Sequence, residues 1–292
     1  MDSNIELAIV QAAIAAANGG VGYIASSLIT GYLLSKSEIR KYTNDFKAQK
    51  FREVADKMVE DGVLSYKRIR DMKNLWDIAE EADDYMRKNC GEHYEIDKSG
   101  FDLDWLAKFL KSAADISDKE VQKFWARILA GEFENRGSMP LSVIHALSLM
   151  NLESANAFLN LSRFCFRDGK KQNCMHPLVF FSKNRTLYES VDYCISFSTL
   201  KDLERIGLIY CDFKDEFIFE RAKLLWYGNH KLLVENANGI VQCGNVTLTG
   251  AGQALLSVLN DKLPEPENRI LEHVIHIYKK RQYRITLDNR QY

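Results

Sequence analysis

The sequence predicts a mainly α fold: a helical N-terminal and central region followed by a small α+β winged-helix-like module near the C-terminus. Apolar residues recur at three-and-four spacing over most of residues 36–170, which is the helical period. Short strand-like runs separated by turn residues appear only after residue 187. We expect five segments: residues 1–35, 36–95, 96–170, 171–260 and 261–292.

Composition excludes several classes of protein. The chain is 46% hydrophobic, which is enough to bury a sizeable core. Its 39 basic and 40 acidic residues nearly cancel, whereas a dedicated nucleic-acid binder depends on an excess of positive charge, so we expect no nucleic-acid partner. The six cysteines form no C-x-x-C pair, which favours reduced thiols in the cytoplasm.

Residues 7–35 contain no charged side chain, whereas Glu6 and Lys36 bound the run on either side. A membrane-spanning helix needs about 20 apolar residues, so this segment is long enough to enter a bilayer. It is rich in alanine, glycine and serine, which allow helices to associate closely in lipid. The large apolar residues that we expect to insert are Ile9, Val10, Ile14, Val21, Ile24, Leu28, Ile29 and Leu33.

A basic flank follows the uncharged run. Residues 36–52 hold six positive and two negative side chains, and Lys36, Arg40 and Lys41 lie next to the run. Such a flank stays on the cytoplasmic side and is attracted to anionic lipid. In the alternative interpretation, the stretch Asn18–Gly22 breaks the run into two short helices that are buried in the fold or in an oligomer.

In residues 36–95, the three-and-four spacing of apolar residues among charged ones predicts long amphipathic helices that form a stalk. In the next segment, Ser117 and Glu120 have the spacing of a capping box. A helix with Val121, Phe124, Trp125, Ile128 and Leu129 on one face should follow and end near Gly131. We expect a further helix to begin at Leu152–Glu153 and to include Phe164 and Phe166.

One stretch of this segment carries a family resemblance. The sequence SDKEVQKFWARILAGEFENRGSMPLS is similar to the motif SDEE-x-Q-x-LWA-x-ILAGE-x-x-x-PGS-x-S of a bacterial family, domain of unknown function 2806. Phe124, Arg136 and Pro140 replace residues that are usual in the motif. The resemblance implies no known enzymatic activity and points to phage defence. Its core motif comprises Phe124, Trp125, Ile128, Leu129, Gly131 and Glu132.

The module at residues 187–259 begins with a helix at Ser198–Leu200 that ends at Gly207. We expect a hairpin between Ile209–Phe213 and Phe217–Phe219, and a second hairpin around Asn238-Gly239. Thr249 should cap a helix that follows the strand VTLT. In the basic tail, Ile285 and Leu287 alternate with polar residues as in a strand.

Patterns of catalytic chemistry are missing from the sequence. It has no phosphate-binding glycine loop, no G-x-S-x-G and no H-E-x-x-H, and Glu132 has no partner for acid-base catalysis. Cys165, Cys174 and His176 lack a fourth zinc ligand at a recognisable spacing. We therefore expect that the protein is not an enzyme and that it binds no metal ion and no cofactor.

These observations predict an antiphage effector of the abortive-infection type. It would be cytoplasmic at rest, sense a phage structural protein, form a homo-oligomer and permeabilise the inner membrane through residues 7–35. The alternative is a soluble winged-helix regulator or scaffold in which the first 35 residues drive oligomerisation.

Overall fold

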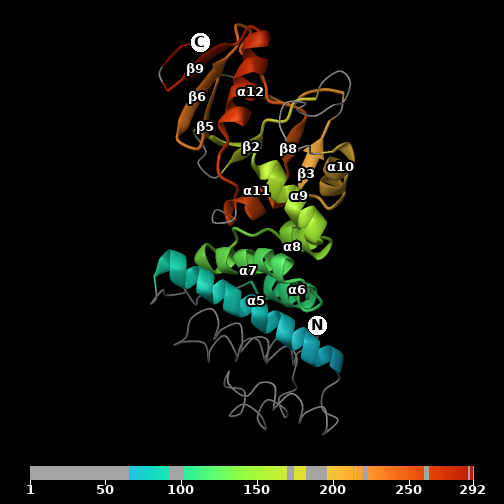
Figure 1. The fold of residues 1–292 in the computed structure, drawn as a ribbon. Coiled ribbons are helices and arrows are strands. Elements are labelled where there is room, and N and C mark those ends of the chain that lie inside the picture. The colour runs from blue at the N-terminus through green and yellow to red at the C-terminus, as the bar shows by residue number, and fades with distance from the viewer. Residues whose placement is uncertain are drawn as a thin grey trace. The chain divides into compact units, whose positions relative to one another are not determined.

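The computed structural model describes residues 66–91, 102–169, 174–181, 196–212, 214–219, 222–259, 263–288 and 290–291. The chain divides into two compact units, residues 1–144 and 145–292 (Figure 1). The predicted insertion residues between Ile9 and Leu33, and the flanking Lys36, Arg40 and Lys41, lie outside the described residues.

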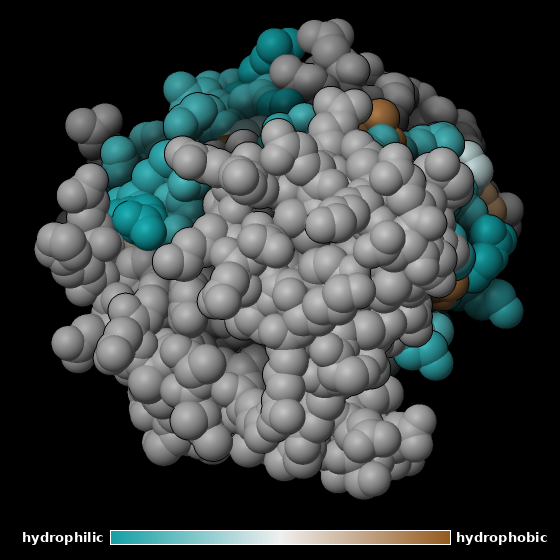
Figure 2. Space-filling model, turned by 90° about the horizontal axis from the view of Figure 1, so that it is seen from below, coloured by the Kyte–Doolittle hydropathy of each residue, from teal (hydrophilic) through white to brown (hydrophobic). Residues whose placement is uncertain are grey.

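The described part of the first unit is helical. It contains α5 (Tyr66–Cys90), α6 (Leu103–Ala113), α7 (Lys119–Glu134) and the start of α8 (Leu141–Ser148). Helices α5 and α7 make the most extensive contact, and Leu75, Ile78, Trp125 and Ile128 of these two helices belong to the buried core. The described residues visible from the side shown in Figure 2 are mainly hydrophilic, as the charged face of α5 leads one to expect.

The second unit combines helices and strands. Its helices are α9 (Leu152–Ser162), α10 (Phe197–Arg205), α11 (Gly250–Ser257) and α12 (Asn268–Lys280). Its described strands are β1 (Cys165–Asp168), β2 (Met175–Pro177), β3 (Ile209–Cys211), β4 (Ile218–Phe219), β5 (Lys223–Tyr227), β6 (His230–Glu235), β7 (Val241–Gln242), β8 (Val246–Leu248), β9 (Arg284–Leu287) and β10 (Arg290–Gln291).

The six-stranded sheet has the order β10-β9-β6-β5-β1-β2, and the pairs given for it are antiparallel. Helix α12 lies against one face (Figure 1) and buries Ile270, Val274 and Tyr278. The buried residues of the strands alternate with more exposed ones, as in a sheet that is covered on one side. Leu232, Val234 and Ile285 are fully buried on this covered face.

Residues 209–248 form one long antiparallel ribbon. Its base is β3 with β8, its middle is β4 with β7, and its end is the tight β5–β6 hairpin, where Tyr227 is paired with His230. Gly228 in the two-residue turn has φ +56°, a conformation that glycine adopts readily. The ribbon is therefore a single hairpin that is interrupted by two excursions of the chain.

The two excursions compensate each other. Between the base and the middle, seven steps from Cys211 to Ile218 face four steps from Gln242 to Val246. Between the middle and the end, four steps from Phe219 to Lys223 face seven from Val234 to Val241. The first excursion is held by the buried Asn245 amide, which donates to the Asp212 and Asp215 carbonyl oxygens.

The prediction of a mainly α fold is wrong, since the described part of the chain is mixed α+β. Both predicted hairpins are also wrong: β3 pairs with β8 rather than β4, and Asn238-Gly239 lies in the second excursion rather than at a hairpin end. The winged-helix-like module is thus replaced by the long ribbon. Strands β5 and β6, at the end of the ribbon, belong to a sheet that also contains β9 and β10 of the predicted basic tail.

Several local predictions are confirmed. Helix α7 buries the predicted apolar face, α9 begins at Leu152, β9 contains Ile285 and Leu287, and Thr249 caps α11 by accepting from Gly252 N–H at 3.0 Å.

Other local predictions are wrong. Asp118, not Ser117, caps α7, because its carboxylate accepts from the N–H groups of Glu120 and Val121. Helix α7 continues past Gly131 to Glu134. Helix α9 ends at Ser162, so Phe164 lies in the turn that follows it and Phe166 lies in β1 rather than in a helix.

Two glycines of α11 give a matched test of its packing. A Cβ on Gly252 would lie 2.1 Å from the Leu208 carbonyl oxygen, whereas a Cβ on Gly250 meets nothing within 4 Å. Gly252→Ala should destabilise the protein by about 1–3 kcal/mol through overpacking. Gly250→Ala should be neutral or stabilising by up to about 1 kcal/mol. Urea unfolding of both variants checks this, and equal midpoints would contradict the described packing.

Candidate functional site

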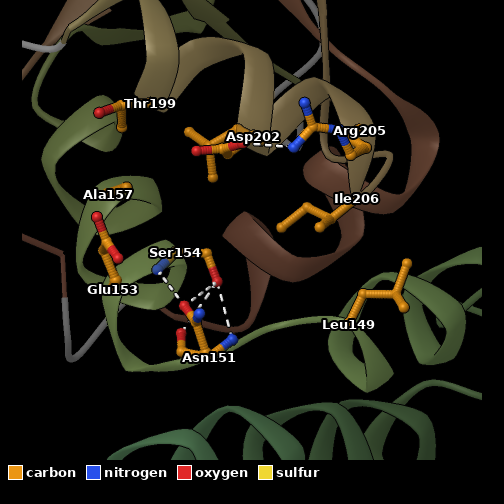
Figure 3. Close-up of a pocket in the computed structure, with 10 residues that line it drawn as sticks. Leu149, Asn151, Glu153, Ser154, Ala157, Thr199, Asp202, Arg205 and Ile206 are labelled. Atoms are coloured by element: carbon orange, nitrogen blue, oxygen red, sulfur yellow. Dashed lines mark hydrogen bonds and ion pairs between the residues drawn. The ribbon is translucent and has the colours of Figure 1, made fainter.

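A cleft of about 290 Å³ lies between α9 and α10 in the second unit (Figure 3). Glu153, Ser154 and Ala157 lie on the α9 side, opposite Thr199, Asp202 and Ile206 on the α10 side. The lining residues are Leu149, Asn151, Glu153, Ser154, Ala157, Thr199, Asp202, Leu203, Arg205 and Ile206.

Reciprocal hydrogen bonds fix the start of α9 beside this cleft. The Asn151 side chain accepts from Ser154 N–H at 2.8 Å, and the Ser154 hydroxyl accepts from Asn151 N–H at 2.9 Å. Two helix-terminal donors are thereby satisfied, which is the function of a capping box. These hydrogen bonds fix the first turn of α9 and with it the cleft residues Asn151 and Ser154.

Helix α10 is anchored at both of its ends. Ser196 accepts from Thr199 N–H at its start, and near its end Glu204 accepts from Cys211 N–H of β3. Burial alone would raise the pKa of Glu204, but hydrogen bonds from Lys201 and Cys211 N–H outweigh it and lower that pKa. The Glu204 carboxylate therefore stays ionised and holds α10 on the ribbon.

The cleft offers groups for binding. Arg205 donates to Asp202 at 2.7 Å, but both side chains are largely exposed, so this pair contributes little stability and can exchange partners. Leu149 is 52% exposed beside the polar groups. Carboxylate, guanidinium, hydroxyl and amide groups next to apolar side chains are suited to a peptide segment of a partner protein.

A second polar cluster surrounds Asp168. This buried carboxylate accepts from Lys223 and lies 3.3 Å from His176 Nε2, which is also 3.7 Å from the Cys174 Sγ atom. Because Cys174 and Asp168 approach the same ring nitrogen, His176 cannot pass a proton from one to the other in this arrangement. The carboxylate instead accepts from the Lys223 ammonium group, which stabilises its charge.

The structure separates Cys165 from Cys174 and His176, the three residues whose chemistry would suit zinc. Cys174 and His176 lie together, whereas the thiol of Cys165 is within 3.8 Å of the Leu161 carbonyl oxygen, and burial raises its pKa. Within the described ranges, no group of three or more histidine, cysteine, aspartate or glutamate residues is arranged to hold a metal ion. Sequence spacing gave no sign of Asp168 or Lys223, which come from strands β1 and β5.

The predicted core-motif residues form the interior of the first unit. Phe124, Trp125, Ile128, Leu129, Gly131 and Glu132 are all buried in α7. The Trp125 ring meets Phe109 edge to face, with ring centroids 5.2 Å apart. On the same helix, the Arg127 guanidinium lies 3.9 Å from the centre of the Tyr85 ring of α5 and 3.5 Å from Glu81. The motif thus joins α7 to its neighbours.

Glu132 has a structural role. It is 6% exposed, and its two carboxylate oxygens accept from Gly137 N–H at 2.8 Å and Met139 N–H at 3.1 Å. These bonds close the turn that follows α7 onto the end of that helix.

The role of Glu132 as an acceptor through both carboxylate oxygens can be tested by replacing one oxygen with an NH₂ group. Glu132→Gln loses a charge-assisted acceptor and places an NH₂ group against a backbone donor, so it should lower the free energy of unfolding by about 1–3 kcal/mol. The matched change Glu134→Gln, at an exposed position of the same helix, should alter it by less than about 0.5 kcal/mol. Chemical denaturation measures both, and a stable Glu132→Gln protein would refute this role.

Comparison with known proteins gives a family and no characterised relative. No curated protein and no solved structure matches the chain. Among the described residues, no helix combines the length and the apolarity that crossing a membrane requires. Residues 64–268 match the family described as a protein of unknown function, DUF2806, which confirms the predicted family. Because the match extends over more than half of its length, the chain belongs to the DUF2806 family.

Proposed function

We propose that the protein is a non-enzymatic antiphage effector of the abortive-infection type. Its folded body binds a phage structural protein, several chains then associate, and their residues 7–35 enter and permeabilise the inner membrane. The protein is cytoplasmic before this event. The observation that carries the proposal is the uncharged run of residues 7–35 with its basic flank of net charge +4.

Release of residues 7–35 requires binding free energy from the trigger protein. A trigger protein shifts the population of the released state only by the difference between its affinities for the two states. A shift from about 1% to about 99% released needs a difference of about 5.5 kcal/mol. The small residues of the run then favour close helix association in lipid, and the basic flank keeps the body at the cytoplasmic surface.

The α9–α10 cleft supports the trigger-binding part of the proposal. Its walls are held by helix caps at Asn151 and Ser196, so a partner meets a preformed surface. The exposed Leu149 supplies apolar area, and the Arg205–Asp202 pair supplies exchangeable polar contacts.

A charge placed in the uncharged run tests the membrane step. Ile14→Asp or Ile24→Asp adds about 3–4 kcal/mol to the cost of inserting each helix, so both should abolish dye leakage from anionic liposomes and toxicity in cells. The matched control is Ile218→Asp, because Ile218 is 54% exposed in the folded body.

If the two groups of variants leak dye equally, the membrane step is wrong. A salt-sensitive gel shift on duplex DNA without any leakage would favour the regulator instead.

Filling the cleft tests the trigger-binding step separately. Ala157→Met places a larger side chain between α9 and α10 and should weaken protection against phage at least about tenfold, the effect of losing about 1.4 kcal/mol of binding. Asn156→Met changes the adjacent, exposed residue of α9, which is not part of the lining, and should leave protection intact. Plating efficiency of phage compares the two. Equal protection would remove the cleft from the proposal.

A further inference from the structure

The uncovered face of the six-stranded sheet carries a row of side chains that the sequence alone does not bring together. The strand register pairs Arg167 of β1 with Trp226 of β5, and Trp226 with Lys231 of β6. Residues paired across antiparallel strands point to the same face. Arg167, Trp226 and Lys231 therefore form one line across three strands, here called the Trp226 row.

The Trp226 row lies on the face opposite helix α12. Its strand neighbours Asp168, Leu225, Tyr227 and Leu232 are buried, whereas Arg167 and Lys231 are exposed and Trp226 is partly exposed. In Figure 1, α12 lies on the other side of β5, β6 and β9, and no helix of the described part covers this face. Leu224 and Leu233, paired with each other and partly exposed, extend the apolar area beside Trp226.

Charge complementarity indicates an anionic partner. Within the described part of the chain, neither the Arg167 nor the Lys231 side chain has an acidic partner, while the nearby acids are engaged. Asp288 accepts from Lys231 N–H at 2.9 Å and lies 2.8 Å from His230 Nδ1, and Glu235 lies 4.0 Å from Arg284. The two cations flank the indole at one strand spacing each, about 4.8 Å.

We propose that the Trp226 row binds single-stranded nucleic acid. The indole ring stacks on an unpaired base, and the two cations neutralise the phosphates on either side of it, which is how aromatic residues on sheet surfaces bind RNA and DNA single strands. In a duplex the faces of the bases are stacked on one another, so no base face is free to stack on the indole. The near-neutral charge of the whole chain restricts this activity to a few phosphates. This inference does not depend on the membrane function.

The full-length protein and a fluorescein-labelled 12-mer of deoxythymidine provide the test, by fluorescence anisotropy at about 50 mM salt. Trp226→Ala should weaken binding at least about fivefold because the stack is lost, and Trp226→Phe should retain most of it. The double variant Arg167→Gln/Lys231→Gln should reduce the slope of log K against log salt by about 1.4 because two phosphate contacts are lost. Thermal unfolding of each variant confirms that it is folded.

The matched control is Lys214→Gln/Lys280→Gln, which removes the same charge at exposed positions of the same unit and should bind like the parent protein. Equal loss in this control would show that only net charge matters and would overturn the proposal. So would preference for a duplex of the same length, displacement of the 12-mer by an equal charge of polyglutamate, or binding to phosphatidylglycerol vesicles but not to the 12-mer.

Discussion

The register of the ribbon at residues 209–248 is the constraint on which the second unit depends. At its base, β3 and β8 bring the end of α10 and the start of α11 together, and Leu208 O accepts from Thr249 N–H at 3.0 Å. At its far end, the β5–β6 hairpin supplies the two central strands of the large sheet. The α9–α10 cleft and the Trp226 row thus lie at opposite ends of the same interrupted ribbon.

Polar contacts between distant segments stabilise this arrangement. Arg281, after α12, donates to both carboxylate oxygens of Glu216 in the first excursion at 2.6 Å and lies over the Phe180 ring. The Tyr227 hydroxyl donates to Arg163 O and accepts from Glu267 N–H, and burial raises its pKa to about 12. Such partly buried, fully bonded groups specify one packing of the helices on the sheet.

The helices were predictable because their signals are local. The apolar spacing of α7, the start of α9 at Leu152–Glu153 and the threonine before α11 are signals that lie in or within a few residues of the element they define. The sheet was not predictable in the same way. Its strands are two to six residues long, and their partners are set by excursions that shift the register, a property that no short window of sequence contains.

Asn238-Gly239 shows why pairing partners are hard to predict from a local turn signal. A turn does form there, with Gly239 at φ +75°, but the strands on either side of it do not pair with each other. The true hairpin end, Gly228-Asn229, was the signal overlooked. The candidate sites were missed for a related reason. The cleft joins residues about fifty positions apart, and the Trp226 row joins β1 to β5 across a similar separation.

The compensating excursions also limit how the lengths of these loops can evolve. Each excursion adds three residues to one side of the ribbon only, and the two excursions lie on opposite sides. Loss of one excursion alone would make the two sides of the ribbon differ in length by three residues, whereas loss of both would keep the two sides equal. Among members of the family, insertions and deletions in these two loops should therefore occur together.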